Sequence, residues 1–192
     1  METLIFATNN LHKIDEVRKI LNNRFNIISL KEAGINIDIP EPHDTLEKNA
    51  LEKSSTIFRL IKKNCFSEDT GLEVDKLNGA PGVKSARYAG DAADNELNID
   101  KLLQNMTGIE QRNAQFRTVI SLIFNGIEYQ FEGICKGLIL KERRGDNGFG
   151  YDAVFIPEGS NHSFAEMNME DKNKFSHRKK AMEKFIQFLQ GL

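Results

Sequence analysis

The chain has 192 residues, of which 40% are apolar and 28% are charged, and its formal net charge is −2. This composition is typical of a folded, water-soluble protein, and the length suits one domain that can comprise two small lobes. A net charge so close to zero gives no electrostatic reason to bind nucleic acid, and no apolar run reaches the roughly 20 residues that span a bilayer. We therefore expect neither a nucleic-acid partner nor a membrane segment.

The N-terminus and the cysteines indicate a cellular compartment. The segment METLIFATNN lacks the basic leader of a signal peptide. Cys65 and Cys135 are isolated, so they form neither a CxxC pair nor a disulfide framework. Both observations favour the reducing cytoplasm.

The first half of the chain alternates short apolar runs with helical periodicity. LIFAT (4–8) predicts a buried strand, and NLHKIDEVRKIL (10–21) predicts a helix with an apolar face. The residues Asp44-Thr45-Leu46-Glu47 predict a capping box that opens a helix ending near Lys63. The apolar pair Cys65-Phe66 then begins a further strand, so the predicted order is strand, helix, helix, strand.

The second half contains a long hairpin and a terminal helix. A helix is predicted from about Asp94, and Asn125-Gly126 between two apolar segments is the strongest short hairpin signal. The last helix is predicted from Ser176, with Ala181, Met182, Phe185, Phe188 and Leu189 on one face. Helices interleaved with strands and a central hairpin predict an α/β fold with a mixed sheet.

The turn ATNNLHK (7–13) joins a strand to a helix N-terminus. Free backbone N–H groups and a positive dipole at such an end favour phosphate binding, and Lys13 lies within reach of the same anion. The ordinary alternative is a helix cap followed by a solvated lysine. The local sequence favours this alternative.

Two adjacent carboxylates, Glu68 and Asp69, follow the apolar residues of the strand that begins at Cys65. On an extended strand they point to opposite faces, so a single metal ion would be held mainly by one of them. Hard oxygen ligands suit Mg²⁺, which also binds substrate phosphates. A solvated strand end with both acids paired to lysines is an equally good interpretation.

Three further segments, residues 39–45, 147–157 and 171–181, present polar or aromatic groups. Glu41 lies between Pro40 and Pro42, which restrict the backbone and present the carboxylate at low entropic cost. NGFGYDAVFIP (147–157) places glycines around Phe149, which favours close approach of a flat ligand and stacking on the ring. The alternatives are that Glu41 is an ordinary turn residue and that residues 147–157 form a glycine-containing turn with Phe149 in the core.

The segment DKNKFSHRKKA (171–181) is the most informative of these. Ser176 is a good N-cap, which places His177 and Arg178 in the first turn of the helix. Basic groups there oppose the helix dipole, so they favour a docking anion or a nucleobase carbonyl over a purely structural role. The phosphate loop G-x-x-x-x-G-K-[ST], HExxH and G-x-S-x-G are all missing from the sequence.

Taken together, four blocks of the sequence resemble the inosine triphosphatase family, the XTP/dITP diphosphatases. The blocks are TNNLHK, SEDTGLEVDKLNGAPGVKSARYAG, GFGYDAVF and AEMNMEDKNKFSHRKKA. They occur in the family's order and extend over nearly the whole chain.

The resemblance implies a fold, a reaction and an assembly. The expected fold is α/β, an elongated mixed β-sheet flanked by helices, in which residues 1–192 form one domain of two lobes with a central nucleotide-binding cleft. The expected reaction is the Mg²⁺-dependent hydrolysis of ITP, dITP and XTP to the monophosphate and pyrophosphate, which clears deaminated purines from the nucleotide pool. The expected assembly is a homodimer.

The resemblance also assigns residues. Asp69 matches the metal-bound catalytic carboxylate, which orients or deprotonates the attacking water, and Glu41 matches a second metal-linked acid. The turn that contacts the triphosphate consists of Thr8, Asn9, Asn10, Leu11, His12 and Lys13. Thr70 replaces the serine more usual in bacterial members and keeps the hydroxyl, whereas Lys84 stands where an aromatic residue is common.

The remaining assignments concern the base. The base-stacking loop comprises Phe149, Gly150, Tyr151 and Asp152, and the segment that reads the purine contributes Lys172, His177 and Arg178. Two other functions stay open: a related house-cleaning pyrophosphatase for other modified nucleotides, and a nucleotide sensor without turnover.

Overall fold

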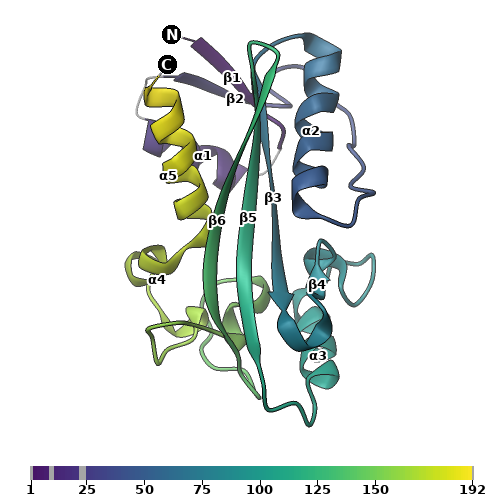
Figure 1. Ribbon diagram of the computed structural model, residues 1–192, viewed down its shortest axis with the longest axis vertical. Helices are drawn as coiled ribbons and strands as arrows, with labels where there is room; N and C mark the ends of the chain where they lie inside the picture. Colours follow the sequence, from purple (N-terminus) through teal and green to yellow (C-terminus); the bar gives the residue numbers. More distant parts are fainter. Residues whose placement is uncertain (1, 9–10, 22–24, 192) are drawn as a thin grey trace. The chain divides into compact units, whose positions relative to one another are not determined.

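The computed structural model describes residues 2–8, 11–21 and 25–191 (Figure 1). Two compact units share this chain. Unit 1 comprises Met1–Asp69, Val119–Glu132 and Ala181–Leu192, and unit 2 comprises Thr70–Thr118 and Gly133–Lys180. Within the described residues the strands form a seven-stranded sheet of order β2-β1-β3-β5-β6-β7, with β4 paired to β3. The mixed α/β fold predicted from the sequence is confirmed.

Unit 1 begins with a parallel arrangement of strands. Its first elements are β1 (Glu2–Phe6), α1 (Leu11–Leu21), β2 (Phe25–Ser29), α2 (Leu46–Ile61) and the start of β3 (Cys65–Val74). Strand β1 pairs in parallel with both β2 and β3. The predicted order of two consecutive helices was wrong, because β2 lies between them. Its five residues FNIIS are too few, and too weakly alternating, to stand out in the sequence.

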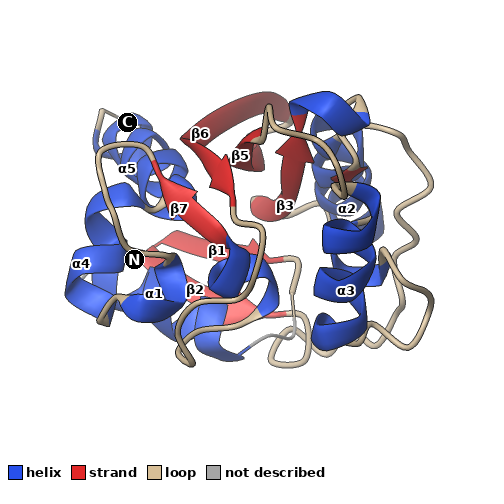
Figure 2. Cartoon of the chain, turned by 90° about the horizontal axis from the view of Figure 1, so that it is seen from below, coloured by secondary structure: helices blue, strands red, loops and turns tan. Residues whose placement is uncertain are grey.

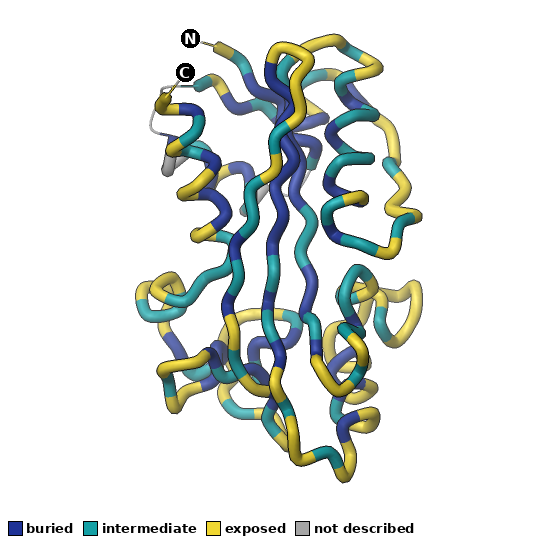
Figure 3. The backbone as a smooth tube through the Cα atoms, in the orientation of Figure 1, coloured by how far each residue is buried: buried dark blue, intermediate teal, exposed yellow. Residues whose placement is uncertain are grey.

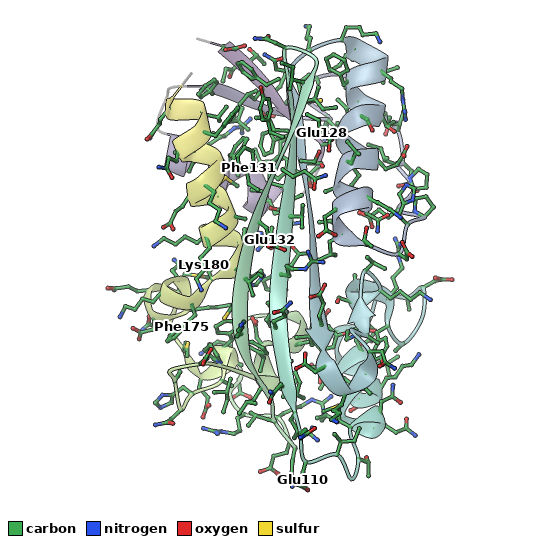
Figure 4. All side chains as sticks on the ribbon, in the orientation of Figure 1. Glu110, Glu128, Phe131, Glu132, Phe175 and Lys180 are labelled. Carbon is green, nitrogen blue, oxygen red and sulfur yellow. The ribbon has the colours of Figure 1, made fainter. Side chains whose placement is uncertain are left out.

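The core of unit 1 lies on both faces of these strands. On one face the rings of Phe6 and Phe66 stack at 4.3 Å, and Phe66 packs 4.9 Å from Phe185 of α5 (His177–Gln190). Phe131 points from β6 (Ile127–Ile139) toward the same helix, with its ring 5.6 Å from that of Phe185 (Figure 4). On the other face, buried side chains such as Ile57 of α2 contact the sheet. The sheet therefore carries helices on both sides.

The start of α2 differs in detail from the predicted capping box. Thr45 is the N-cap, and its hydroxyl accepts the N–H of Lys48 at 3.3 Å. The third helical residue is therefore a lysine, which cannot return the hydrogen bond as a glutamate would. A single cap replaces the predicted pair, and the helix ends at Ile61, two residues before Lys63.

The hairpin was predicted correctly. Strand β5 (Asn113–Phe124) and β6 are joined at Asn125-Gly126, whose φ angles of 51° and 79° match the mirror-image turn that this dipeptide favours. Most of β5 is buried, as its dark tube in Figure 3 shows. Both strands contribute residues to unit 1 and to unit 2.

Unit 2 is built around the remaining parts of the long strands. Its other elements are β4 (Pro81–Gly82), α3 (Asn95–Asn105), β7 (Phe155–Pro157), α4 (Met169–Phe175) and short 3₁₀ turns. Strand β7 runs antiparallel to the end of β6 (Figure 2). Asp94 caps α3 and α5 begins at His177, as predicted, whereas the sequence analysis missed α4. No helix in the described ranges combines the length and apolar character needed to cross a bilayer.

Candidate functional site

In unit 1, the turn after β1 and the acidic pair of β3 lie at the same edge of the sheet. The strands are parallel, and the N–H of Ala7 donates to the carbonyl of Phe66 at 2.7 Å. Thr8 thus follows β1 at the level where β3 reaches Glu68 and Asp69. The carboxyl ends of parallel strands are the usual place for ligands in α/β sheets.

Glu68 forms an ion pair with Lys13. The lysine belongs to the first turn of α1, and its Nζ lies 2.6 Å from Oε1 of Glu68, whose side chain is 2% exposed. A carboxylate buried so deeply requires a cation beside it. The ammonium remains partly accessible and stands at the N-terminus of a helix, where an anion is also favoured.

Asp69 belongs to a second ionic group. The Nζ of Lys53, on α2, lies 3.2 Å from Oδ1 of Asp69 and also contacts Oε1 of Glu41. Lys53 and Asp69 are 12% and 13% exposed, whereas Glu41 is more accessible. Two carboxylates therefore meet at one cation. They come from β3 and from the segment that precedes α2.

The two acids of β3 point to opposite faces, as the alternation of a strand predicts. Glu68 meets a lysine of α1 and Asp69 meets a lysine of α2. The lysine pairing expected of an ordinary strand end is present, but the strand end is not solvated. The structure therefore confirms the lysine pairing of the ordinary interpretation but not its solvated strand end.

Part of the predicted triphosphate turn lies outside the described residues. Asn9 and Asn10 are in this group, and so are the side chains of Leu11 and His12. Thr8 is half-buried, with its carbonyl accepting the N–H of Leu30 at 3.3 Å. Of this turn, Thr8 and Lys13 are the residues whose side chains are described.

Unit 2 contains a cluster of a different character. Phe149 is 69% exposed, and the ammonium of Lys172 lies 5.2 Å from the centre of its ring. The same ammonium lies 5.3 Å from the ring of Phe164 and 2.5 Å from Oδ2 of the buried Asp152. Asp152 also accepts the N–H of Phe149 at 2.9 Å. An exposed aromatic face thus stands beside a fixed ion pair.

Gly148 is required by the position of Asp152. A Cβ atom at Gly148 would lie 2.1 Å from Oδ2 of Asp152. The φ angle of Gly148, +83°, is also unfavourable for residues other than glycine. Gly150, with φ of +58°, has open space around it. The first glycine therefore allows the close approach of loop and carboxylate, and the second allows only the turn.

Two predicted residues of unit 2 are engaged within the fold. Tyr151 is buried, and its hydroxyl donates to the carbonyl of Ser85 at 2.8 Å, while burial raises the pKa of its phenol. The hydroxyl of Thr70 pairs with that of Thr118 at 2.8 Å. Lys84 and Arg87 are exposed on the turn that Tyr151 holds.

The first turn of α5 carries His177 and Arg178, as predicted. Ser176 accepts the N–H of Lys179 at 3.2 Å, which is the expected cap. The ring of His177 stacks on Phe116 with centres 4.9 Å apart and planes inclined by 12°. The stack fixes the imidazole plane at the helix start.

Lys53 is the site residue that sequence reasoning missed. It lies on the same helical stripe as Leu46, Ala50 and Ile57, which are buried. A lysine on the apolar side of an amphipathic helix indicates a buried partner. This signal was available in the sequence.

The site contains no thiolate chemistry. Burial raises the pKa of Cys65 to about 12 and that of Cys135 to about 11, so both thiols stay protonated at neutral pH.

Within the described part of the chain, no three or more His, Cys, Asp or Glu side chains gather closely enough to hold a metal ion by themselves. A metal held here would need ligands besides the protein's carboxylates.

The comparisons with known proteins agree with one another. The model of the Ham1 family matches residues 4–188. A dITP/XTP pyrophosphatase of Porphyromonas gingivalis is 50% identical over 190 residues, which cover 98% of each chain. One of Bacillus subtilis is 40% identical over 195 residues, which cover 100% of this chain and 98% of the relative.

Solved structures extend this likeness to the fold. The Ham1 protein of Staphylococcus aureus is 35% identical with a TM-score of 0.95 over 99% of each chain. A HAM1 protein from Coxiella burnetii is 32% identical with the same TM-score of 0.95 over 100% of each chain. The family resemblance inferred from the sequence is confirmed.

Proposed function

The chain belongs to the Ham1 family, and from this premise we propose that it hydrolyses deaminated purine nucleoside triphosphates to the monophosphate and pyrophosphate. The proposed substrates are dITP, XTP and ITP. The observation that carries the proposal is the convergence of Glu41 and Asp69 on one cation, Lys53. Relatives that match over nearly their whole length and are named dITP/XTP pyrophosphatase support it.

We propose Mg²⁺ as the cofactor, with Asp69 and Glu41 as its protein ligands. The donor set fits, because Mg²⁺ is usually bound by one or two carboxylates together with substrate phosphates and water. Two carboxylate oxygens already meet at one ammonium, so the position tolerates a cation. When bound, Mg²⁺ supplies charge neutralisation at the phosphates and acidifies water.

In unit 1 the side chains of this cluster also act on the phosphates and the water. Asp69 orients the water that attacks the α-phosphorus and accepts its proton, while the bond to the bridging oxygen breaks and pyrophosphate leaves. Lys13 and the N-terminus of α1 offset the negative charge that develops on the pyrophosphate. Glu68 fixes Lys13 by the ion pair at 2.6 Å. Lys53 limits repulsion between Glu41 and Asp69.

In unit 2 the proposed role is recognition of the base. Phe149 provides an exposed ring for stacking. Donors such as His177 and Arg178 suit the 6-oxo group of hypoxanthine and xanthine and would meet the 6-amine of adenine with like polarity. A buried polar mismatch of this kind discriminates strongly. Lys172 and Asp152 hold the stacking loop in place by their ion pair.

Two further proposals concern the setting of the enzyme. We propose that it acts as a homodimer, which the family resemblance supports, and in the cytoplasm, which its isolated cysteines support. Sedimentation of the purified protein at micromolar concentration tests the first, and a sedimenting species of monomer mass would contradict it.

One assay tests the proposed function. Pyrophosphate is measured from dITP, ITP, XTP, GTP, ATP and dUTP, with and without Mg²⁺. We expect release from the first three and only with the metal. Nucleotide binding without pyrophosphate would indicate a sensor, preference for dUTP would indicate another house-cleaning enzyme, and release of orthophosphate in place of pyrophosphate would overturn the proposal.

A further inference from the structure

Asn49 connects α2 to the segment that carries Glu41. Its side chain is buried, with 1% of the residue exposed. The N–H of His43 donates to Oδ1 of Asn49 at 2.9 Å, and Nδ2 of Asn49 donates to the carbonyl of His43 at 3.2 Å. The amide of Asn49 thus satisfies both backbone groups of a single residue, much as a neighbouring strand would.

This double hydrogen bond holds a segment that has no regular structure of its own. Residues 35–45 are all described, and none lies in a helix or strand. Glu41 precedes His43 by two residues, between two prolines that limit its backbone rotation. Fixing the peptide groups of His43 therefore also limits where the backbone of Glu41 can lie.

The other attachment of the segment lies one turn further along the helix. Lys53 follows Asn49 by four residues, so both side chains project from the same side of α2. Lys53 contacts the carboxylate of Glu41, while Asn49 holds the backbone of His43. The first contact depends on the charge of the Glu41 carboxylate, whereas the second joins an amide to backbone groups and does not.

The start of α2 does not need the Asn49 side chain. Thr45 caps the helix with its hydroxyl, and its carbonyl accepts the backbone N–H of Asn49 at 3.1 Å. Asparagine is a poor helix former, and a buried amide is costly unless it is satisfied. An alanine would suit this helical position better if the segment at His43 did not have to be held.

We propose that Asn49 is a positioning residue, which sets the carboxylate of Glu41 for a divalent cation shared with Asp69. This inference rests on the proposed function, because it assumes that these two acids hold the metal. Residues that orient metal ligands without touching the ion typically change metal affinity by about 10–100-fold when they are replaced. We therefore assign Asn49 an effect on cation affinity rather than on the chemical step.

The test measures metal binding directly. Mn²⁺, which is visible by electron paramagnetic resonance, is titrated into the full-length protein with the α,β-methylene analogue of dITP, which cannot be cleaved at that bond. We expect Asn49→Ala to weaken Mn²⁺ binding by about 10-fold or more. Asn49→Asp keeps the acceptor for the N–H of His43 but turns an oxygen toward its carbonyl, so we expect a loss of at least the same size.

Ser54→Ala is the matched control. Ser54 is buried on the same helix, and its hydroxyl contacts Ser121 at 2.8 Å rather than the segment of Glu41. We expect wild-type Mn²⁺ affinity in this variant even if its stability falls. Amide hydrogen exchange supplies a second readout, with residues 38–44 exchanging faster in Asn49→Ala while the later turns of α2 keep their protection.

The outcomes separate the inference from the proposed function. If the wild-type protein binds no Mn²⁺ with the analogue, the proposed metal role of Glu41 and Asp69 fails. If the wild type binds it and Asn49→Ala binds it equally well, the positioning role fails alone. Equal acceleration of exchange along the whole of α2 would also overturn it, and Asn49→Asp decides the question if the alanine variant does not fold.

Discussion

The acidic cluster of unit 1 and the aromatic cluster of unit 2 are built on different physical principles. In unit 1, Glu41, Glu68 and Asp69 are ion-paired with two lysines, and Glu68 and Asp69 are nearly buried. In unit 2, one ion pair stands beside an aromatic face that is largely open to solvent. The first cluster is suited to neutralising charge, and the second is suited to binding a flat, polar ring.

This difference has a consequence for mutants. Phosphates are common to every nucleoside triphosphate, so damage to the unit 1 cluster should affect all substrates equally. The base is what distinguishes substrates, so damage to the unit 2 cluster should change affinity and selectivity more than turnover. Variants of single residues can therefore break or sharpen the comparison.

The largest effect is expected from Asp69→Asn. The amide keeps the shape of the side chain and can still accept from Lys53, but it loses the charge and the basicity that the proposed mechanism assigns to Asp69. We expect kcat to fall about 100-fold or more for dITP, XTP and ITP alike. The rate of pyrophosphate release at saturating nucleotide and Mg²⁺ measures kcat. A near-normal kcat in Asp69→Asn would exclude the catalytic role of Asp69.

Glu73→Gln is the control for this variant. Glu73 lies on the same strand, and its carboxylate also meets a cation, Arg117, at 2.9 Å. We expect its replacement to lower stability, because the pair is largely shielded from water, and to leave kcat within about threefold of wild type, because Glu73 belongs to neither cluster. Equal losses in the two variants would show that any broken ion pair on β3 disables the enzyme.

A smaller effect is expected from Phe149→Ala. Stacking of a base on an aromatic ring is worth about 1–3 kcal/mol, so kcat/KM for dITP should fall about tenfold, mainly through KM. Met169→Ala is the control, since Met169 is 71% exposed in the same unit. Both variants should unfold at the wild-type urea concentration, and an unchanged KM in Phe149→Ala would remove the stacking role.

Local chemistry was readable from the sequence, whereas partnerships between distant residues were not. Asn125-Gly126 and Ser176 specify a turn and a cap through their own conformational preferences, and the structure contains both. The partners of Lys53 are 12 and 16 residues away: Glu41 meets it where the segment before α2 folds back on the helix, and Asp69 where α2 packs on β3. Strand β2 was missed because its five residues alternate too weakly to stand out, and its strand conformation depends on pairing with β1.

The smallest effect is expected from an ionic group of unit 1 that lies outside the cluster. Glu32 accepts the backbone N–H of Ser29 at 2.7 Å and two hydrogen bonds from Arg18 at 2.7 and 2.9 Å. The pKa of Glu32 is lowered from 4.5 to about 2. The main cause is the hydrogen bond from the N–H of Ser29, and the next is the hydrogen bonding to Arg18. A depressed pKa means that the ionised form stabilises the fold.

That stabilisation should depend on pH in a defined window. It is fully present above the unfolded pKa of 4.5, declines as the pH falls, and is lost below about 2. Because the side chain is 47% exposed, solvent screens the pair, and Glu32→Gln should cost at most about 1 kcal/mol at pH 7. Urea unfolding of both proteins between pH 7 and pH 3 should show the difference shrinking below pH 4.5, with kcat and KM unchanged at pH 7. A stability difference between the two proteins that stays constant over this range would mean that packing, rather than charge, makes Glu32 stabilising. A changed kcat or KM in Glu32→Gln would mean that the ionic chemistry of unit 1 extends beyond its cluster.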